Sequence, residues 1–394
     1  MNSNRDPLIK CRLLVLVVLT ASYLTGCSQI PREAINPETL FAQDSVAFGV
    51  RPEIPTPEQL LHLEDRQKQE ILNFINHPDY QDLPSDTKIL RYLTQVTYNF
   101  HYQADTYTVP EAINKREGNC LTLAMVTTAI ADLMGVEIEY ELVNSPPVFE
   151  REQDVVSRGI HVRSHVLRPE AEIKQFFIAK RGTIIDYFPS RDAHFVGNLT
   201  ESEMLSSYYN NIAVVLLEKN QLDTAYWYSR EALNYAPYYA PNINTLAVIY
   251  RRHGNWQHAE TIYQWAIARV DKPLTLLKNY RALLEHQGRY DEAERLLKKI
   301  SQLKDTNPYS WLDLGDEAFQ QGDYQQAKRF YKKSIKLDPY LQFGYEGLAK
   351  TWFQLGKPKK AKKMWIKAQD NSLDDEMKRF YQNKIDQLNN TIDQ

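Results

Sequence analysis

Residues 311–339 read WLDLGDEAFQQGDYQQAKRFYKKSIKLDP, two stretches of helical spacing on either side of Gly322. Apolar and small residues recur on one face of each stretch, which predicts two helices joined by a turn at the glycine. The pattern returns every 34 residues, with alanine and glycine in fixed places: Ala225, Ala259, Ala293, Ala327, Ala361, Gly254, Gly288, Gly322 and Gly356, and Asn220 in the first turn. A period of this length predicts a row of stacked helical hairpins.

The repeated pattern resembles the tetratricopeptide repeat, in which alanine lets two helices approach closely and glycine permits the turn between them. On this resemblance we place five repeats and a capping helix with a tail at 206–239, 240–273, 274–307, 308–341, 342–375 and 376–394. The third repeat departs most from the pattern, at Tyr280, Arg281 and Ile300. The resemblance implies an all-α solenoid whose aromatic residues pack between hairpins and whose concave groove binds a protein or peptide partner.

The N-terminal residues 1–27 carry the features of a secretion signal. Three basic residues precede an apolar run at 13–24, which is too short to span a bilayer. The run ends in LTGC at 24–27, which resembles the lipobox of bacterial lipoproteins. The resemblance implies cleavage before Cys27 and attachment of diacylglycerol and a further acyl chain such as palmitate, which would anchor the protein to a membrane. The alternative is a secreted soluble protein in which the cysteine is coincidental.

Ser28 stands where aspartate would retain a Gram-negative lipoprotein in the inner membrane. The sequence therefore predicts a lipid-anchored protein of the bacterial cell envelope, on the outer membrane and facing the periplasm. Residues 28–55 combine prolines with scattered polar residues and predict an extended linker. The formal net charge of −3 leaves no basic surplus for nucleic acid, and the nine histidines show no ligand-spaced cluster. We therefore expect neither a metal nor another cofactor.

Residues 56–200 mix helical and strand patterns, which predicts an α+β domain. The expected elements are helices at 56–75, from Ser85 and at 119–134, a strand at 136–143, a polar loop at 144–158, and strands at 160–167, 175–180 and 183–188. Asn119 suits the start of the third helix and Gly135 its end. A tight turn at Arg181-Gly182 joins the last two strands.

Cys120 is the one cysteine left once Cys11 is removed with the signal and Cys27 is lipidated. A thiol without a disulfide partner in an oxidising compartment is either buried as a small apolar residue or used in chemistry. The sequence EGNCLTLA at 117–124 places Cys120 in the first turn of a helix. The backbone N–H groups and the helix dipole there favour a thiolate and could bind an oxyanion.

A base for this thiol is expected on the strand IHVRSHVL, where His161, Arg163 and His165 share one face at about 7 Å per two residues. Asp186 lies on the following hairpin. A cysteine on a helix, a histidine on a strand and an aspartate on the next strand resemble the transglutaminase-like fold of the papain-like cysteine enzymes, over roughly residues 88–190. The resemblance implies Cys120 as nucleophile, His161 as general base and acid, and Asp186 as orienting carboxylate. In the family the histidine opens its strand, which makes His165 the alternative.

The sequence thus predicts an α+β transglutaminase-like N-terminal domain followed by an all-α tetratricopeptide-repeat solenoid. The implied function is a membrane-anchored cysteine acyl-transfer enzyme, of the peptidase, amidase or transglutaminase type, that acts through a thioester on a periplasmic protein or peptide. The main alternative is a catalytically inactive transglutaminase-like scaffold whose repeats organise an envelope complex. A third possibility is a peptide-binding lipoprotein in which the α+β domain only caps the solenoid.

Overall fold

A computed structural model describes residues 37–42, 45–152, 155–172, 182–187, 194–271, 273–303, 308–372 and 375–392. The predicted signal peptide, the lipidation residue Cys27, the strand expected at 175–180 and the turn residue Arg181 lie outside these ranges. Residues 1–43 and 44–394 form two separate units. The described part of the first unit is one short helix, α2 (Pro37–Ala42).

The second unit begins with helices that precede a sheet. They are η1 (Ser45–Phe48), α3 (Pro57–Leu60), α4 (Asp65–Ile75), η2 (Pro78–Tyr80), α5 (Ser85–Thr97), α6 (Val109–Lys115) and α7 (Cys120–Met134). The single helix predicted from Thr56 to Ile75 was wrong, because α3 ends after one turn. Glu64 starts α4 with its own capping box, which interrupts the chain of helical hydrogen bonds between the two helices. Helix α7 starts after Asn119 and ends at Gly135 as predicted.

The sheet has four antiparallel strands in the order β5-β4-β3-β6. Their bounds are β3 (Ile138–Glu152), β4 (Val155–Leu167), β5 (Gly182–Ile185) and β6 (His194–Leu199). The polar loop predicted at 144–158 was wrong, because β3 and β4 continue there as a long hairpin. A register shift between Asn144 and Phe149 takes up the residues that include Pro146 and Pro147, which lack the N–H that a regular ladder needs.

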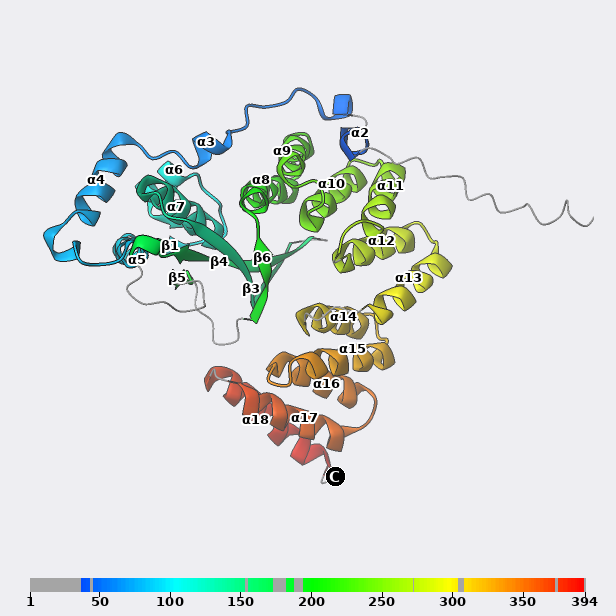
Figure 1. Cartoon of the computed structure of the whole chain (residues 1–394). Helices are drawn as coiled ribbons and strands as arrows, with labels where there is room; N and C mark the ends of the chain where they lie inside the picture. The colour runs from blue at the N-terminus through cyan, green and yellow to red at the C-terminus, as the bar shows by residue number, and fades with distance from the viewer. Residues whose placement is uncertain are drawn as a thin grey trace, which may run out of the picture. The chain divides into compact units, whose positions relative to one another are not determined.

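Helix α7 lies against β4, and this contact forms the centre of the core (Figure 1). The helix is buried along its length from Cys120 to Ala131, which explains why it is apolar on every side. Its two central threonines are satisfied by tyrosines of the sheet region: Thr128 Oγ1 lies 2.7 Å from Tyr140 Oη, and Thr127 Oγ1 lies 2.6 Å from Tyr187 Oη. These paired hydroxyls hold α7 in one register over the sheet.

Helices in antiparallel pairs make up the C-terminal half. They are α8 (Glu201–Glu218), α9 (Leu222–Tyr235), α10 (Ala240–Arg252), α11 (Trp256–Ile267), α12 (Leu274–His286), α13 (Tyr290–Gln302), α14 (Pro308–Gln320), α15 (Tyr324–Leu337), α16 (Gln342–Gln354) and α17 (Pro358–Asn371), followed by α18 (Asp375–Ile392). The repeated alanines are buried where paired helices meet. The predicted turn residues all have positive φ, with the lowest value, 58°, at Asn220 and the highest, 90°, at Gly254. This confirms that these positions require a left-handed backbone.

The first helix pair shares its core with the sheet region. Met204 and Tyr209 of α8 belong to the same cluster of buried residues as Ile71 and Val162. Residues 45–55, predicted as part of an extended linker, also pack on this pair. The Phe48 ring is buried and stacks on Tyr226 of α9, with the ring centroids 4.0 Å apart. This contact packs the segment against the helix pair, whereas an extended linker would be solvated.

Candidate active site

Three features place Cys120 at the first position of α7. Arg116 has φ 57° and ends α6, after which β2 (Glu117–Gly118) pairs in parallel with β1 (His101–Tyr102). Gly118 has φ 146°, and a Cβ there would lie 2.6 Å from Thr122, so this position requires glycine. The Asn119 side chain accepts a hydrogen bond from Thr122 N at 2.9 Å and donates one to Thr106 Oγ1 at 2.7 Å. The helix start is therefore fixed on both sides of the cysteine.

The structure brings Cys120, His161 and Asp186 together. His161 lies on β4, and its Nε2 is hydrogen-bonded to Oδ1 of Asp186, which follows β5. The imidazole is also hydrogen-bonded to the Cys120 side chain. Cys120 is 8% exposed, His161 5% and the Asp186 side chain 21%. The three groups predicted from the sequence thus form one chain of polar contacts from the helix across two strands.

Two opposing effects act on the Cys120 pKa. Burial raises it, but hydrogen bonds from His161 and from the Val162 N–H, the charge of His161 and the Tyr102 hydroxyl together lower the pKa below its ordinary value. For His161, burial lowers the pKa, while hydrogen bonds and charge from Cys120 and Asp186 raise it above the ordinary value. A lowered thiol pKa and a raised imidazole pKa both favour a thiolate beside an imidazolium, which is the reactive form of a cysteine nucleophile.

His165, the alternative to His161, lies elsewhere in the sheet region. Its Nδ1 is 3.7 Å from Oε2 of Glu139, its partner across the β3–β4 ladder. Arg163 makes the same kind of cross-strand pair, in which Nε donates to Glu141 at 2.5 Å. His161, Arg163 and His165 occupy alternate positions of one strand. Arg163 and His165 each pair with a carboxylate of β3. His161 is therefore the histidine that can assist Cys120.

Tyr102 is a site residue that the sequence did not indicate. It reaches Cys120 because its two-residue strand pairs with Glu117–Gly118, where Tyr102 stands opposite Gly118. Tyr102 is 40% exposed, but the partial desolvation of its hydroxyl and the negative charge of Cys120 raise the pKa of the tyrosine, so the hydroxyl keeps a proton to donate to the thiolate. A two-residue parallel pair leaves no periodic pattern in the sequence, and the tyrosine precedes the cysteine by 18 residues. Neither a strand pattern nor closeness in the sequence could therefore have identified Tyr102.

We expect Tyr102→Phe to slow the alkylation of Cys120 at acidic pH by about threefold to tenfold, because one hydrogen bond to the thiolate is lost. The thiol pKa should rise, which moves the acidic limb of the rate profile to higher pH and leaves the alkaline plateau unchanged. The measurement is the iodoacetamide labelling rate between pH 4 and 9, with Tyr98→Phe as control because that side chain is 86% exposed. Superimposable profiles for Tyr102→Phe and the wild type would show that the hydroxyl does not act on the sulfur.

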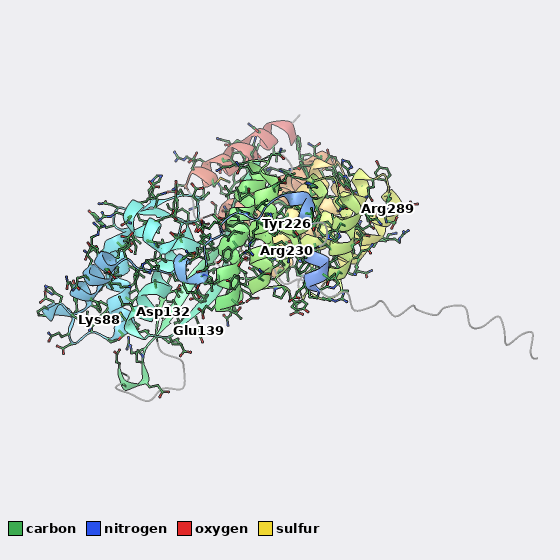
Figure 2. All side chains as sticks on the ribbon, turned by 90° about the horizontal axis from the view of Figure 1, so that it is seen from above. Lys88, Asp132, Glu139, Tyr226, Arg230 and Arg289 are labelled. Carbon is green, nitrogen blue, oxygen red and sulfur yellow. The ribbon has the colours of Figure 1, made fainter. Side chains whose placement is uncertain are left out.

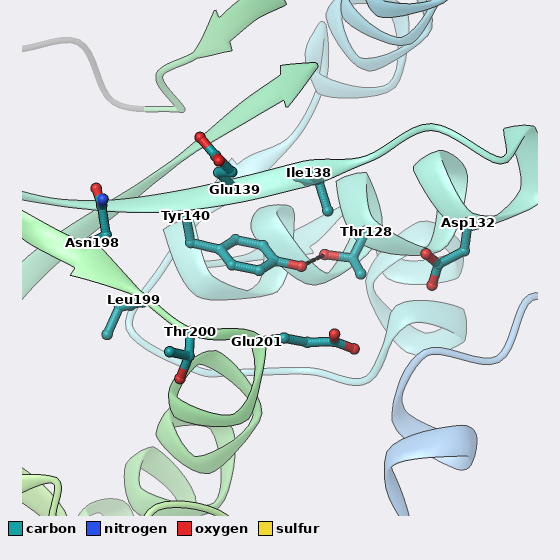
Figure 3. Close-up of a pocket in the computed structure, with 9 residues that line it drawn as sticks. All are labelled: Thr128, Asp132, Ile138, Glu139, Tyr140, Asn198, Leu199, Thr200 and Glu201. Atoms are coloured by element: carbon teal, nitrogen blue, oxygen red, sulfur yellow. Dashed lines mark hydrogen bonds between the residues drawn. The ribbon is translucent and has the colours of Figure 1, made fainter. Parts of the chain in front are cut away.

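A separate cavity of about 300 Å³ lies at the opposite end of α7 (Figure 3). Its lining includes Asp132 of α7, Glu139 of β3 and Glu201 of α8, and the first two are labelled in Figure 2. Burial raises the pKa of Asp132. In the described part of the chain, His, Cys, Asp and Glu side chains do not gather in a group that could hold a metal ion. This cavity shares no lining residue with the Cys120 cluster.

The family model of the tetratricopeptide repeat matches residues 308–341. Solved structures that resemble the chain include pilF of Pseudomonas aeruginosa, with 19% identity over 48% of this chain and 90% of that one and a TM-score of 0.33. Others are YrrB, described as a repeat protein with an unusual peptide-binding site (18%, 44% and 89%, TM-score 0.29), and MamA of Desulfovibrio magneticus (16%, 44% and 96%, TM-score 0.30). No curated protein sequence matches the chain.

The described helices include none with the length and apolar character needed to cross a bilayer. The matched segment coincides with α14 and α15, one of the helix pairs of the C-terminal half. Repeats of this kind bind proteins or peptides through the surface that the stacked hairpins create. Residues 308–341 are therefore a tetratricopeptide repeat within a row of paired helices, and such a repeat implies a role in protein interaction.

Proposed function

We propose that this protein is a lipid-anchored cysteine acyl-transfer enzyme with a transglutaminase-like domain, in which Cys120, His161 and Asp186 form the catalytic triad. The observation that carries the proposal is the chain of contacts from the Cys120 thiol through the His161 imidazole to the Asp186 carboxylate. A core cysteine gains nothing from a charged imidazole, whereas a nucleophile gains both a base and an acid.

The proposed reaction begins when the Cys120 thiolate attacks a carboxamide carbon. As the C–N bond breaks, His161 gives its ring proton to the departing amine, and an acyl thioester remains on the sulfur. Water or a second amine then attacks the thioester, His161 accepts the proton of that nucleophile, and the C–S bond breaks to restore the thiolate. Asp186 holds Nε2 of His161, which leaves Nδ1 for these proton transfers. The N–H groups of the first turn of α7 face the developing oxyanion in this scheme.

The proposed location of the protein in the cell rests on its N-terminal sequence. The LTGC sequence at 24–27 supports lipidation of Cys27 and attachment to a bacterial membrane, with the outer membrane favoured by Ser28. A periplasmic protein or peptide is then the substrate class. The solenoid supports recruitment of that substrate or of another protein partner, because the first helices of its hairpins carry polar side chains. Two of these are Asn244 and Asn279, which are hydrogen-bonded to each other at 2.6 Å.

The second candidate function is a scaffold that has lost turnover. The low exposure of Cys120, 8%, favours this alternative, because an attacking sulfur needs access to its substrate. In the scaffold, the contacts among the three residues would serve only to satisfy buried polar groups.

Thiol reactivity separates the two candidates without knowledge of the substrate. A catalytic Cys120 should react with iodoacetamide at pH 6 at least tenfold faster than glutathione, since an ordinary thiol of pKa about 8.5 holds little thiolate there. The enzyme should also accumulate an acyl adduct of Cys120 from an activated ester such as p-nitrophenyl acetate, seen by mass spectrometry of the intact chain.

Cys120→Ser is the matched control for both measurements, because it keeps the size of the side chain and removes the thiol. Slow labelling at pH 6 together with no acyl adduct would reject the enzyme and leave the scaffold. Rapid labelling with an adduct that hydroxylamine removes would support the thioester route.

A further inference from the structure

Positive charge gathers on the second helices of the last two hairpins. Residues 308–372 contain twelve lysines and arginines against seven aspartates and glutamates, although the whole chain has a formal net charge of −3. Helix α15 has five basic residues and no acidic one, and α17 has five basic residues and Asp370. The acidic residues of these hairpins instead lie mainly on the first helices, at Asp313, Asp316, Glu317 and Glu346. The charge is therefore segregated by helix.

The two basic helices contribute to one continuous surface. Trp352 of α16 lies between them, and its ring centroid is 5.3 Å from Nζ of Lys328 and 6.0 Å from Nζ of Lys332, both on α15. Nζ of Lys360, on α17, is 4.6 Å from the same centroid. Further lysines follow at intervals of three or four residues along α15 and α17, which places them on the same face of each helix. We call the resulting set the lysine surface: Lys328, Lys332, Lys336, Lys359, Lys360, Lys363 and Lys367.

The lysine surface lacks compensating charge in the part of the chain that the structure describes. None of its seven ammonium groups forms an ion pair with a described carboxylate. Most of these side chains are exposed, while Lys328 is half-buried. Like charges held this close repel one another, and the aromatic ring offsets only part of that repulsion. A surface of this kind is stabilised when an anionic partner covers it.

The same helices and the turn after α15 also carry exposed apolar side chains. Ile366 is 38% exposed and lies one helical turn from Lys363, and Leu337 is 37% exposed next to Lys336. Phe353, adjacent to Trp352, is 50% exposed, and Tyr340, just after α15, is 77% exposed. Lysines and exposed aliphatic and aromatic residues on the same helices are typical of surfaces that rest on a lipid bilayer, where headgroups bind the charged groups and the interface accommodates the apolar groups.

We propose that the lysine surface binds the anionic headgroups of a phospholipid membrane and so holds the end of the solenoid against the bilayer. The exposed aliphatic residues Ile366 and Leu337 favour lipid, because a polyanion would use the charge alone and a single-stranded nucleic acid would use the charge and the aromatic rings. The interaction is independent of catalysis at Cys120, and with a lipid on Cys27 it would supply a second membrane contact at the other end of the chain.

The test uses the chain from Ser28 to Gln394, which lacks the proposed anchor. Its partition onto vesicles is measured by flotation, with phosphatidylcholine alone and with phosphatidylcholine and phosphatidylglycerol at 3:1. We expect at least tenfold stronger binding to the anionic vesicles in 50 mM salt and loss of most of that binding in 500 mM salt. Binding that is equal for both vesicle types would overturn the proposal.

A charge variant gives the sharper comparison. Replacing Lys332, Lys336, Lys363 and Lys367 by glutamine should weaken binding to the anionic vesicles at least thirtyfold, since each lysine near such a surface contributes about 1 kcal/mol. The matched control neutralises Lys68, Lys88, Lys219 and Lys384, which lie outside the surface, and should retain binding within about threefold. Figure 2 marks Lys88 on the sheet-bearing part of the chain.

Circular dichroism and the unfolding midpoint establish that both quadruple variants are folded. Equal losses in the two variants would mean that only net charge matters, and the surface would then have no specific role. Strong binding of a single-stranded oligonucleotide with no binding to anionic vesicles would replace lipid by another class of anion and overturn the proposal.

Discussion

His161→Ala is expected to form the Cys120 thioester about 10³-fold to 10⁴-fold more slowly than the wild type, with an activated ester or any later-identified substrate. The variant loses the hydrogen bond and the positive charge that lower the Cys120 pKa, while burial, which raises that pKa, remains. At pH 7 less thiolate is present, and the departing group receives no proton. Rapid-quench measurement of acyl-enzyme formation gives the rate directly.

His165→Ala is the matched control for this variant. It removes an imidazole from the same strand, four residues away, whose nearest carboxylate is Glu139 at 3.7 Å. We expect the rate of acylation to stay within about threefold of the wild type. If His165→Ala were the slower of the two variants, the assignment of His161 as the base would be wrong, whatever the role of Cys120.

Asp86→Ala should lower the free energy of unfolding by about 3–5 kcal/mol, because it breaks a buried ion pair and leaves its partner uncompensated. Asp86 is 0% exposed and lies in the first turn of α5, where its Oδ1 accepts from Nε of Arg168 at 2.9 Å and its Oδ2 from Nη2 of Arg168 at 3.0 Å. Thr183 Oγ1 of β5 donates to the same carboxylate at 2.7 Å. One side chain thus connects a helix to the ends of two strands of the sheet that carries His161.

The pH dependence of stability provides a second readout for Asp86. Burial by itself raises the Asp86 pKa, but hydrogen bonds from Arg168 and Thr183 and the charge of Arg168 lower the pKa below its ordinary value. A depressed folded-state pKa stabilises the protein above the unfolded-state pKa of about 3.9, and this contribution is lost as the pH falls through the folded-state pKa. The wild type should therefore lose more stability than Asp86→Ala on acidification below about pH 4.

Urea unfolding at pH 7 and at pH 3.5 checks both effects, with Asp79→Ala as the control. The Asp79 side chain is 79% exposed, so its removal deletes one negative charge near α5 without a buried partner. We expect a change below about 0.5 kcal/mol for this control. A loss for Asp86→Ala no larger than that of the control would show that the buried pair does not stabilise the fold.

Much of the solenoid was predictable because its signals are local. A glycine or asparagine is needed wherever φ is positive between two helices, and an alanine wherever their backbones approach closely, so a fixed period appears in the sequence itself. The start of α7 was predictable for the same reason, since Asn119 caps the helix through its own neighbour Thr122. The matched family segment at 308–341 agrees with the stretch that carried this interpretation.

Long-range pairings were predicted less well. Both strands of the β3–β4 hairpin were predicted in part, but its far end was taken for a loop, because prolines and charges in 144–158 weaken the strand pattern while cross-strand pairing still extends it. Strand β6 was not anticipated at all, although it pairs with β3 at the edge of the sheet. The break between α3 and α4 was missed, since an apolar stripe continues across it and the capping box of Glu64 outweighs that stripe.

The sequence by itself determined the period of the paired helices, the position of Cys120 at a helix start and the set of residues that could assist it. Spacing along a strand could not choose between His161 and His165, because both occupy alternate positions of one strand. The tertiary structure made that choice by pairing His165 with Glu139 and setting His161 between the sulfur and Asp186. It also added Tyr102 through a two-residue strand pair, since such a contact depends on how distant segments pack and leaves no trace in local sequence.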